Sequence, residues 1–127
     1  MNAARWAALL FLGTGIVQVL TVPSTLDHIA RTGEHPLVFG NVRSLAGPFD
    51  ALGVDAVIAL GWAFVALGAV EIVTGLLLWQ SRKVGGILAA VATVLGVPFW
   101  LGFALPAWLI VGPLRAALVA RAWKSLR

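Results

Sequence analysis

Apolar residues dominate four long stretches of the chain, at about 6–22, 54–80, 84–104 and 106–122, and charged residues gather between them. Each stretch is close to or above the ~17 to 25 residues that a helix needs to cross the hydrocarbon core of a bilayer. The second stretch is the longest, and the fourth is short and contains Pro113. The pattern predicts an all-α integral membrane four-helix bundle, with residues 1–127 as a single transmembrane domain.

The composition agrees with a membrane protein and excludes several classes of function. The 127 residues are 61% hydrophobic and 11% charged, whereas about a quarter of the residues in a typical soluble domain are charged. The chain has no cysteine, which excludes disulfide bonds, thiol redox chemistry and cysteine metal sites. Its net charge of +4 is explained by basic residues facing an anionic inner leaflet, so no nucleic acid partner is expected.

The basic residues also predict the orientation of the spans, because Lys and Arg are enriched on the cytoplasmic side. With four crossings, six of them fall on one side: Arg5, Arg82, Lys83, Arg121, Lys124 and Arg127. Tryptophans prefer the membrane interface; Trp6, Trp79 and Trp123 fall at this side and Trp62, Trp100 and Trp108 toward the other. We therefore expect a multi-pass protein of the plasma or inner membrane with both termini cytoplasmic.

The segment 23–53 is predicted to be a long outer loop that carries a short helix. Ser24 and Asp27 have a spacing similar to a capping box, which predicts a helix from Ser24 to Arg31, ended by Gly33. Residues 36–51 are expected to lie in the outer interface or to dip back over the mouth of the bundle. The two histidines of the loop match no metal-ligand spacing, so no metal is predicted. An inward-facing His28 acting as an acid or base stays open.

One carboxylate, Glu71, interrupts the second span. Stepping by three or four residues places it on one helical stripe with small and apolar residues: Val57, Gly61, Phe64, Gly68, Gly75 and Leu78. Glycines at this spacing let a neighbouring helix approach closely. Glu71 is therefore predicted to face the packed interior and not the lipid.

Arg115 is the candidate partner of this carboxylate. Both residues should lie about 14 to 15 Å from the cytoplasmic ends of their helices, at ~1.5 Å per residue. If spans two and four are neighbours, the side chains would pair and reduce the cost of burying each charge. The alternatives are a structural ion pair, an Arg115 that extends toward the headgroups, or a polar ligand pocket formed by Glu71, Arg115, Gln18, Thr14 and Thr74.

The opening RWAALLFLGTGIVQVL, the long outer loop and the later EIVTGLLLWQSRKVGGILAAV resemble the DoxX-like group of small four-helix membrane proteins. The corresponding residues are Arg5, Gly15, Glu71, Gly75 and Arg82. The sequence departs from the family at Gln18, where members often carry Lys. Whether Glu71 makes the charge interaction that such a Lys would offer is therefore open in this chain. The resemblance implies the fold, and for some relatives an association with quinone-linked oxidoreductases.

Three functions follow from these residues. The first is a membrane subunit or binding protein that holds a lipophilic small molecule, such as a quinone, isoprenoid or lipid, with quinone as the possible cofactor. The second is an intramembrane enzyme that uses Glu71 with His28 or Asp27 as acid and base. The third is a homodimer that transports small lipophiles, with the glycine stripe as its seam. The expected partners are the lipid bilayer and either a second copy or an oxidoreductase complex.

Overall fold

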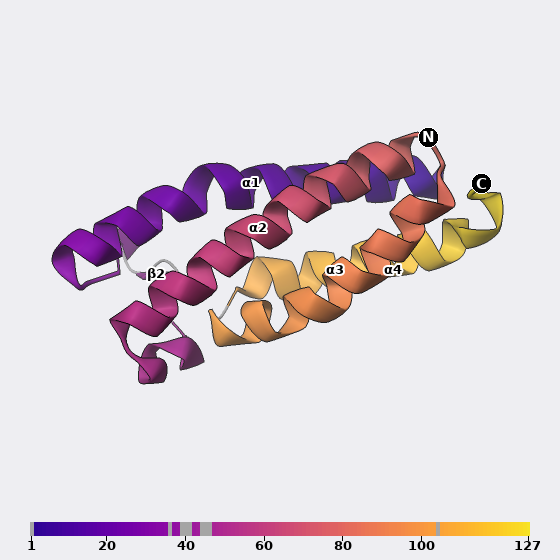
Figure 1. Ribbon diagram of the computed structural model, residues 1–127. Helices are drawn as coiled ribbons and strands as arrows, with labels where there is room; N and C mark the ends of the chain where they lie inside the picture. Colours follow the sequence, from indigo (N-terminus) through magenta and orange to yellow (C-terminus); the bar gives the residue numbers. More distant parts are fainter. Residues whose placement is uncertain (1, 36, 39–41, 44–46, 104) are drawn as a thin grey trace.

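The computed structural model describes residues 2–35, 37–38, 42–43, 47–103 and 105–127. Four helices account for most of this part of the chain: α1 (Ala3–Thr32), α2 (Val54–Trp79), α3 (Lys83–Gly102) and α4 (Pro106–Ala122). They run alternately up and down as an antiparallel bundle (Figure 1). The predicted all-helical fold with four helices is confirmed, and α2, α3 and α4 begin and end within two residues of the predicted apolar stretches.

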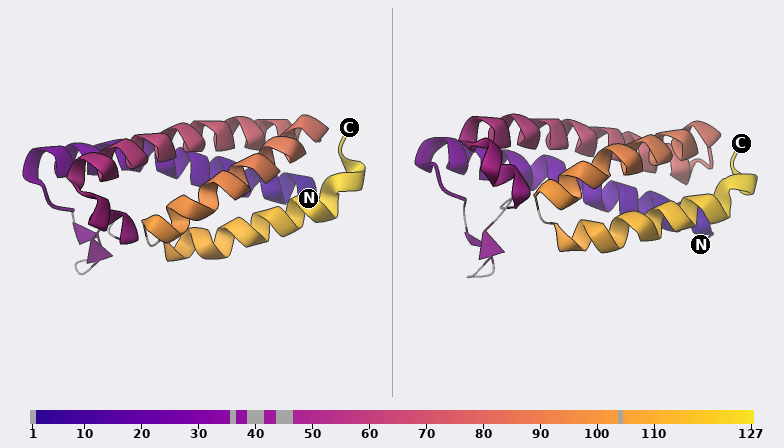
Figure 2. Two further views of the ribbon diagram at one scale, coloured as in Figure 1. Left: turned by 60° about the horizontal axis from the view of Figure 1, so that its bottom comes forward. Right: turned by 90° about the horizontal axis from the view of Figure 1, so that it is seen from below.

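Both ends of the chain lie at one end of the bundle, where a short 3-10 helix, η2 (Trp123–Ser125), follows α4 (Figure 2). At the opposite end, two short antiparallel strands, β1 (Leu37–Val38) and β2 (Val42–Arg43), lie between α1 and a second 3-10 helix, η1 (Pro48–Leu52). Phe49 of η1 packs edge-on against Phe103, with 5.0 Å between ring centroids. This contact fixes the connecting segment against the end of α3.

Helix α1 corrects two predictions: that the first span ends near residue 22, and that a separate short helix follows it. This helix continues for 30 residues through Pro23 to Thr32 and ends at Gly33, whose backbone is left-handed with φ 74°. A proline inside a helix removes one backbone N–H donor. The Ser24 and Thr25 hydroxyls both donate to Thr21 O, so Ser24 continues the helix and does not cap a new one.

The helices pack around a square in the order α1, α2, α3, α4, with α4 returning to α1. The closest approach is between α1 and α2, and glycines make it possible. A Cβ added to Gly15 would lie 2.6 Å from Gly68 O, and one added to Gly75 would lie 2.9 Å from Ala8 O. The prediction that the glycine stripe of the second span packs a neighbouring helix is confirmed, and the neighbour is α1.

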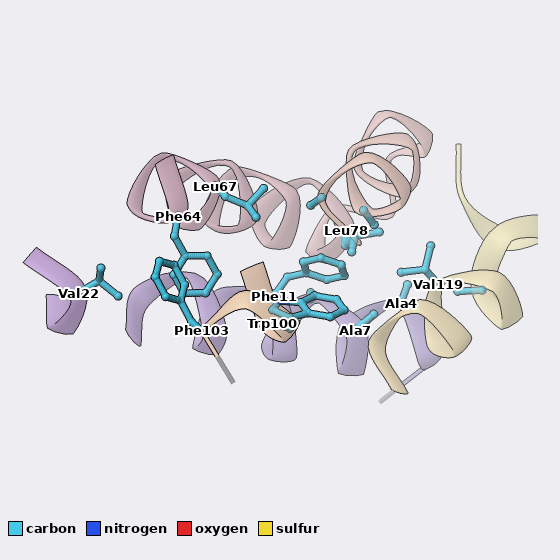
Figure 3. Close-up of a cluster of buried hydrophobic side chains, with 14 of the residues drawn as sticks. Ala4, Ala7, Phe11, Val22, Phe64, Leu67, Leu78, Trp100, Phe103 and Val119 are labelled. Carbon is cyan, nitrogen blue, oxygen red and sulfur yellow. The ribbon is translucent and has the colours of Figure 1, made fainter. Parts of the chain in front are cut away.

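The core is filled by apolar and aromatic side chains from all four helices, as the labelled residues of Figure 3 show. All members of the stripe predicted for the second span are buried, Glu71 included. Phe64 lies at the centre of an aromatic group, 5.5 Å from Phe99 and 5.9 Å from Phe103 between ring centroids.

The outer surface of the bundle is apolar as well. Leu20, Val94 and Ile110 are each more than 70% exposed, which is unfavourable in water and expected in lipid. By length and composition, α1, α2 and α3 could each cross a membrane, whereas α4 has 17 residues and is shorter. These features indicate a membrane protein.

Candidate functional site

A salt bridge crosses the centre of the bundle and joins α2 to α4. Arg115 Nη2 lies 2.5 Å from Glu71 Oε1, and neither side chain has any exposed surface. The predicted match in depth therefore brings the two residues together. The pair forms although α2 and α4 are diagonal and not adjacent in the bundle. The long arginine side chain spans the interior instead.

Thr14 of α1 completes this ion pair. Its hydroxyl accepts a hydrogen bond from Arg115 Nη1 at 2.7 Å and lies 3.1 Å from Glu71 Oε2, to which it donates. Both carboxylate oxygens of Glu71 thus accept a hydrogen bond. Such partners offset the large cost of removing two charges from water.

A second, neutral set of hydrogen bonds lies one turn further along α1. Gln18 is fully buried and donates through Nε2 to Phe64 O of α2 at 3.0 Å. Its Oε1 accepts a hydrogen bond from Trp108 Nε1 of α4 at 3.1 Å. Thr14 and Gln18 therefore each link α1 to both α2 and α4. We call the five side chains Glu71, Arg115, Thr14, Gln18 and Trp108 the polar network.

Aromatic rings enclose the guanidinium group of the network. Arg115 Cζ lies 4.1 Å from the ring centroid of Phe11 and 5.5 Å from that of Trp100, and Figure 3 shows these two rings near one another in the core. Cation–π contacts of this kind stabilise a desolvated cation. Among the described residues, Arg115 Nε and Trp100 Nε1 are the two buried side-chain donors without a hydrogen-bond partner. Hydrogen bonding is therefore incomplete where the guanidinium group lies near the Trp100 ring.

The other predicted site residues lie apart from the ion pair. Thr74 is buried on α2, but its hydroxyl bonds its own helix at Val70 O, 2.8 Å away. Asp27 forms an exposed pair with Arg31 at 3.0 Å. His28 and Asp27 follow Thr14 by 14 and 13 residues of one continuous helix, a separation of ~20 Å at 1.5 Å per residue. The fold thus places neither beside Glu71.

Three aromatic residues around the network were missed by sequence reasoning, which assigned Trp100 and Trp108 to the outer interface. Trp100 is 2% exposed and Trp108 is half-buried. Helical spacing carries the missing signal, since Trp108 lies seven residues before Arg115, and Phe11 lies three before Thr14. A tryptophan or phenylalanine two turns or one turn from a buried polar residue shares its inward face.

An apolar groove of about 540 Å³ lies between α3 and α4. Its walls are small residues, and an indole ring stands at one end; six of its lining residues are Gly86, Ala90, Thr93, Ala116, Ala120 and Trp123. Ala116 of the lining follows Arg115 directly in α4, and the side chains of the ion pair do not line the groove. We call this hollow the α3/α4 groove.

A smaller pocket of about 210 Å³ lies at the opposite end of the bundle. It is lined partly by His35 and Asp50, whose Nε2 and Oδ1 atoms lie 2.9 Å apart. This contact ties the end of α1 to η1. Within the described ranges, no three His, Cys, Asp or Glu side chains cluster closely enough to hold a metal ion.

The arrangement defines a class of protein: an all-helical bundle with an apolar exterior and a buried polar network. No family model matches the chain, and neither a curated protein nor a solved structure is detectably similar to it. Membership of the DoxX-like group therefore stays a prediction from the residues quoted above.

Proposed function

We propose that the protein is a non-catalytic membrane binding protein or subunit that holds the apolar body of a lipophilic molecule in the α3/α4 groove. The observation that carries this proposal is the groove itself, about 540 Å³ in volume and lined almost entirely by small apolar residues. Ligand pockets have volumes of about 300 to 1,000 Å³ and predominantly apolar walls. A lipid, an isoprenoid or the chain of a quinone fits such a site.

The polar network supports binding over acid and base catalysis. A general base needs a free carboxylate oxygen within reach of the substrate, whereas both oxygens of Glu71 are engaged by Arg115 and Thr14. The network instead links α1, α2 and α4, and Arg115 precedes groove residue Ala116 in α4. In this proposal the ion pair fixes the position of α4 and hence the width of the groove.

The membrane arrangement is part of the same proposal. All four helices cross the cytoplasmic or inner membrane, with both ends of the chain and the α2–α3 turn on the cytoplasmic side. The distribution of Lys and Arg supports this orientation, and the apolar outer surface of the helices suits a lipid environment. The groove then opens toward the cytoplasmic leaflet, because Trp123 and Gly86 lie at that end.

Mass spectrometry of the organic extract from detergent-purified protein tests the proposal. Wild type is compared with the double substitution A90L/A120L, which places larger side chains into the groove from two exposed positions. The matched control is Ala117→Leu, an exposed alanine of α4 outside the groove lining. Wild type and Ala117→Leu should retain one lipophile near one per chain, and A90L/A120L should lose it.

A different result would contradict the proposal. If all three proteins carry only the bulk lipids of the membrane in equal amounts, the groove holds no ligand. If a purified lipophile is instead converted to a product by wild type and not by Glu71→Gln, the protein is an enzyme.

A further inference from the structure

We infer that the occupant of the α3/α4 groove is an anionic phospholipid of the cytoplasmic leaflet, with an acyl chain in the groove and its phosphate at the basic mouth. This inference rests on the proposed function, because it names the ligand class of the same groove. The evidence for it is the set of basic residues near Trp123, at the mouth of the groove. The proposal of an apolar ligand gives these charges no role.

A cation stands directly at the mouth of the groove. Trp123 lines its end, and Lys83 Nζ lies 5.3 Å from the centroid of the Trp123 ring. A Cβ added to Gly86 would lie 2.7 Å from Trp123 Cζ3, so the indole packs closely on the first turn of α3. The ammonium group is thus held beside the indole that closes this end of the groove.

Backbone hydrogen bonds gather further basic residues at this point. Lys83 N–H donates to Arg127 O at 2.6 Å, and Arg127 N–H donates to Ser81 O at 2.8 Å. The last residues of the chain are therefore fixed against the α2–α3 turn, next to Arg82. Lys124 follows Trp123 directly and is exposed.

No acidic side chain offsets these cations. Residues 72–127 contain no Asp or Glu, and neither do residues 1–26. The carboxylates Asp27, Glu34, Asp50 and Asp55 lie at the other end of the bundle, and Glu71 is paired within it. An apolar groove that opens among uncompensated cations complements a lipid that has apolar chains and a negative headgroup. Basic pockets between membrane helices on the cytoplasmic side bind such headgroups.

Lipid titration with native mass spectrometry tests the inference on the full chain. Delipidated protein is mixed with phosphatidylglycerol or with phosphatidylcholine of the same acyl chains, and the bound lipids are counted. The variant K83Q/K124Q removes two cations at the mouth. The matched control is Arg5→Gln. Arg5 also stacks on an indole, with Cζ 4.6 Å from the Trp79 ring centroid, but Trp79 does not line the groove as Trp123 does.

Wild type and Arg5→Gln should retain phosphatidylglycerol about tenfold better than phosphatidylcholine, and K83Q/K124Q should lose most of this preference, because each surface cation contributes measurably to anionic lipid binding. Equal retention of both lipids by wild type, or a preference that survives K83Q/K124Q, would overturn the inference. If wild type retains both lipids equally and A90L/A120L abolishes retention, the groove binds a lipophile without regard to headgroup and the proposed function stands. Retention of neither lipid by wild type would overturn the inference. The organic extract of the purified protein then decides the proposed function, because a copurified isoprenoid or quinone would support it and bulk lipid alone would contradict it.

Discussion

Arg115 and Glu71 meet across the diagonal of the bundle, with Nη2 of the guanidinium 2.5 Å from Oε1 of the carboxylate. Their helices are not neighbours, so the interaction acts between opposite corners of the structure. Neighbouring helices are held by glycine contacts, by apolar packing and by the hydrogen bonds of Thr14 and Gln18. A directional pair between opposite corners fixes the register of α2 and α4, and through Thr14 also that of α1.

Breaking this pair should strongly destabilise the protein. Glu71→Gln leaves the buried charge of Arg115 without a counterion, and Arg115→Met leaves the buried charge of Glu71 without one. Each substitution should lower the free energy of unfolding by about 3 to 5 kcal/mol. The double substitution E71Q/R115M removes both charges and should cost less than the sum of the single substitutions. The free energy of unfolding in detergent, measured for all four proteins, gives the coupling.

The exposed pair of Asp27 and Arg31 on α1 is the control for this cycle. Asp27→Asn should lower stability by no more than about 1 kcal/mol, since exposed ion pairs contribute little. Additive effects of the two buried substitutions would show that the diagonal pair carries no coupling.

The Thr14 hydroxyl should matter more than that of Thr74, although both residues were candidates for one site. Thr14→Val removes the acceptor of Arg115 Nη1 and the donor to Glu71 Oε2, and leaving such buried groups unpaired costs about 1 to 3 kcal/mol. Thr74→Val removes a bond within its own helix and should cost less than about 1 kcal/mol. Thermal unfolding of the two variants compares them, and equal losses would contradict a bridging role for Thr14.

Sequence periodicity could predict the buried face of α2 because glycine spacing and one carboxylate fall on a single stripe. Counting residues from the helix ends could likewise predict that Glu71 and Arg115 share a depth, since the rise per residue is constant. Depth leaves the order of helices around the bundle undetermined. The diagonal position of α2 and α4 therefore could not be derived, and the pair was considered only for the case that the two spans are neighbours.

The remaining differences also have physical causes. A proline in the sequence predicts the end of a helix. The single N–H donor that is missing at Pro23 is nevertheless tolerated in a long apolar helix, and α1 continues to Thr32. Tryptophan reads as an interfacial residue, yet Trp108 has a buried acceptor available in Gln18. Position along a span cannot tell an indole that faces headgroups from one that faces a buried amide.

Two glycines of α1 should respond to alanine in opposite directions. At Gly15 the added Cβ would lie 2.6 Å from Gly68 O, a backbone atom that moves only if the helices separate, so Gly15→Ala should cost about 1 to 3 kcal/mol. A Cβ at Gly13 meets nothing within 4 Å, and Gly13→Ala should stabilise the helix by about 0.5 to 1 kcal/mol. Unfolding measured in one detergent decides this, and a tolerated Gly15→Ala would show that α1 and α2 are not in close contact.

The sidedness of Ser125 tests whether α4 crosses the membrane. Its 17 residues span about 26 Å against a hydrocarbon core of ~30 Å, so length alone leaves the crossing marginal. α4 nonetheless lies along both α1 and α3, and Arg121 and Lys124 predict a cytoplasmic position for its end. The chain has no cysteine, which permits single-cysteine labelling with a membrane-impermeant maleimide. Ser125→Cys should react in inverted vesicles and not in intact cells.

Two further positions calibrate this labelling. Gln80→Cys, at the exposed α2–α3 turn, should react from the same side as Ser125→Cys, and Ala51→Cys, in η1, from the opposite side. Reaction of Ser125→Cys from the same side as Ala51→Cys would mean that the end of α4 lies on the outer side and that α4 does not cross the membrane. The α3/α4 groove would then open away from the inner leaflet, and its basic mouth would not meet cytoplasmic lipids.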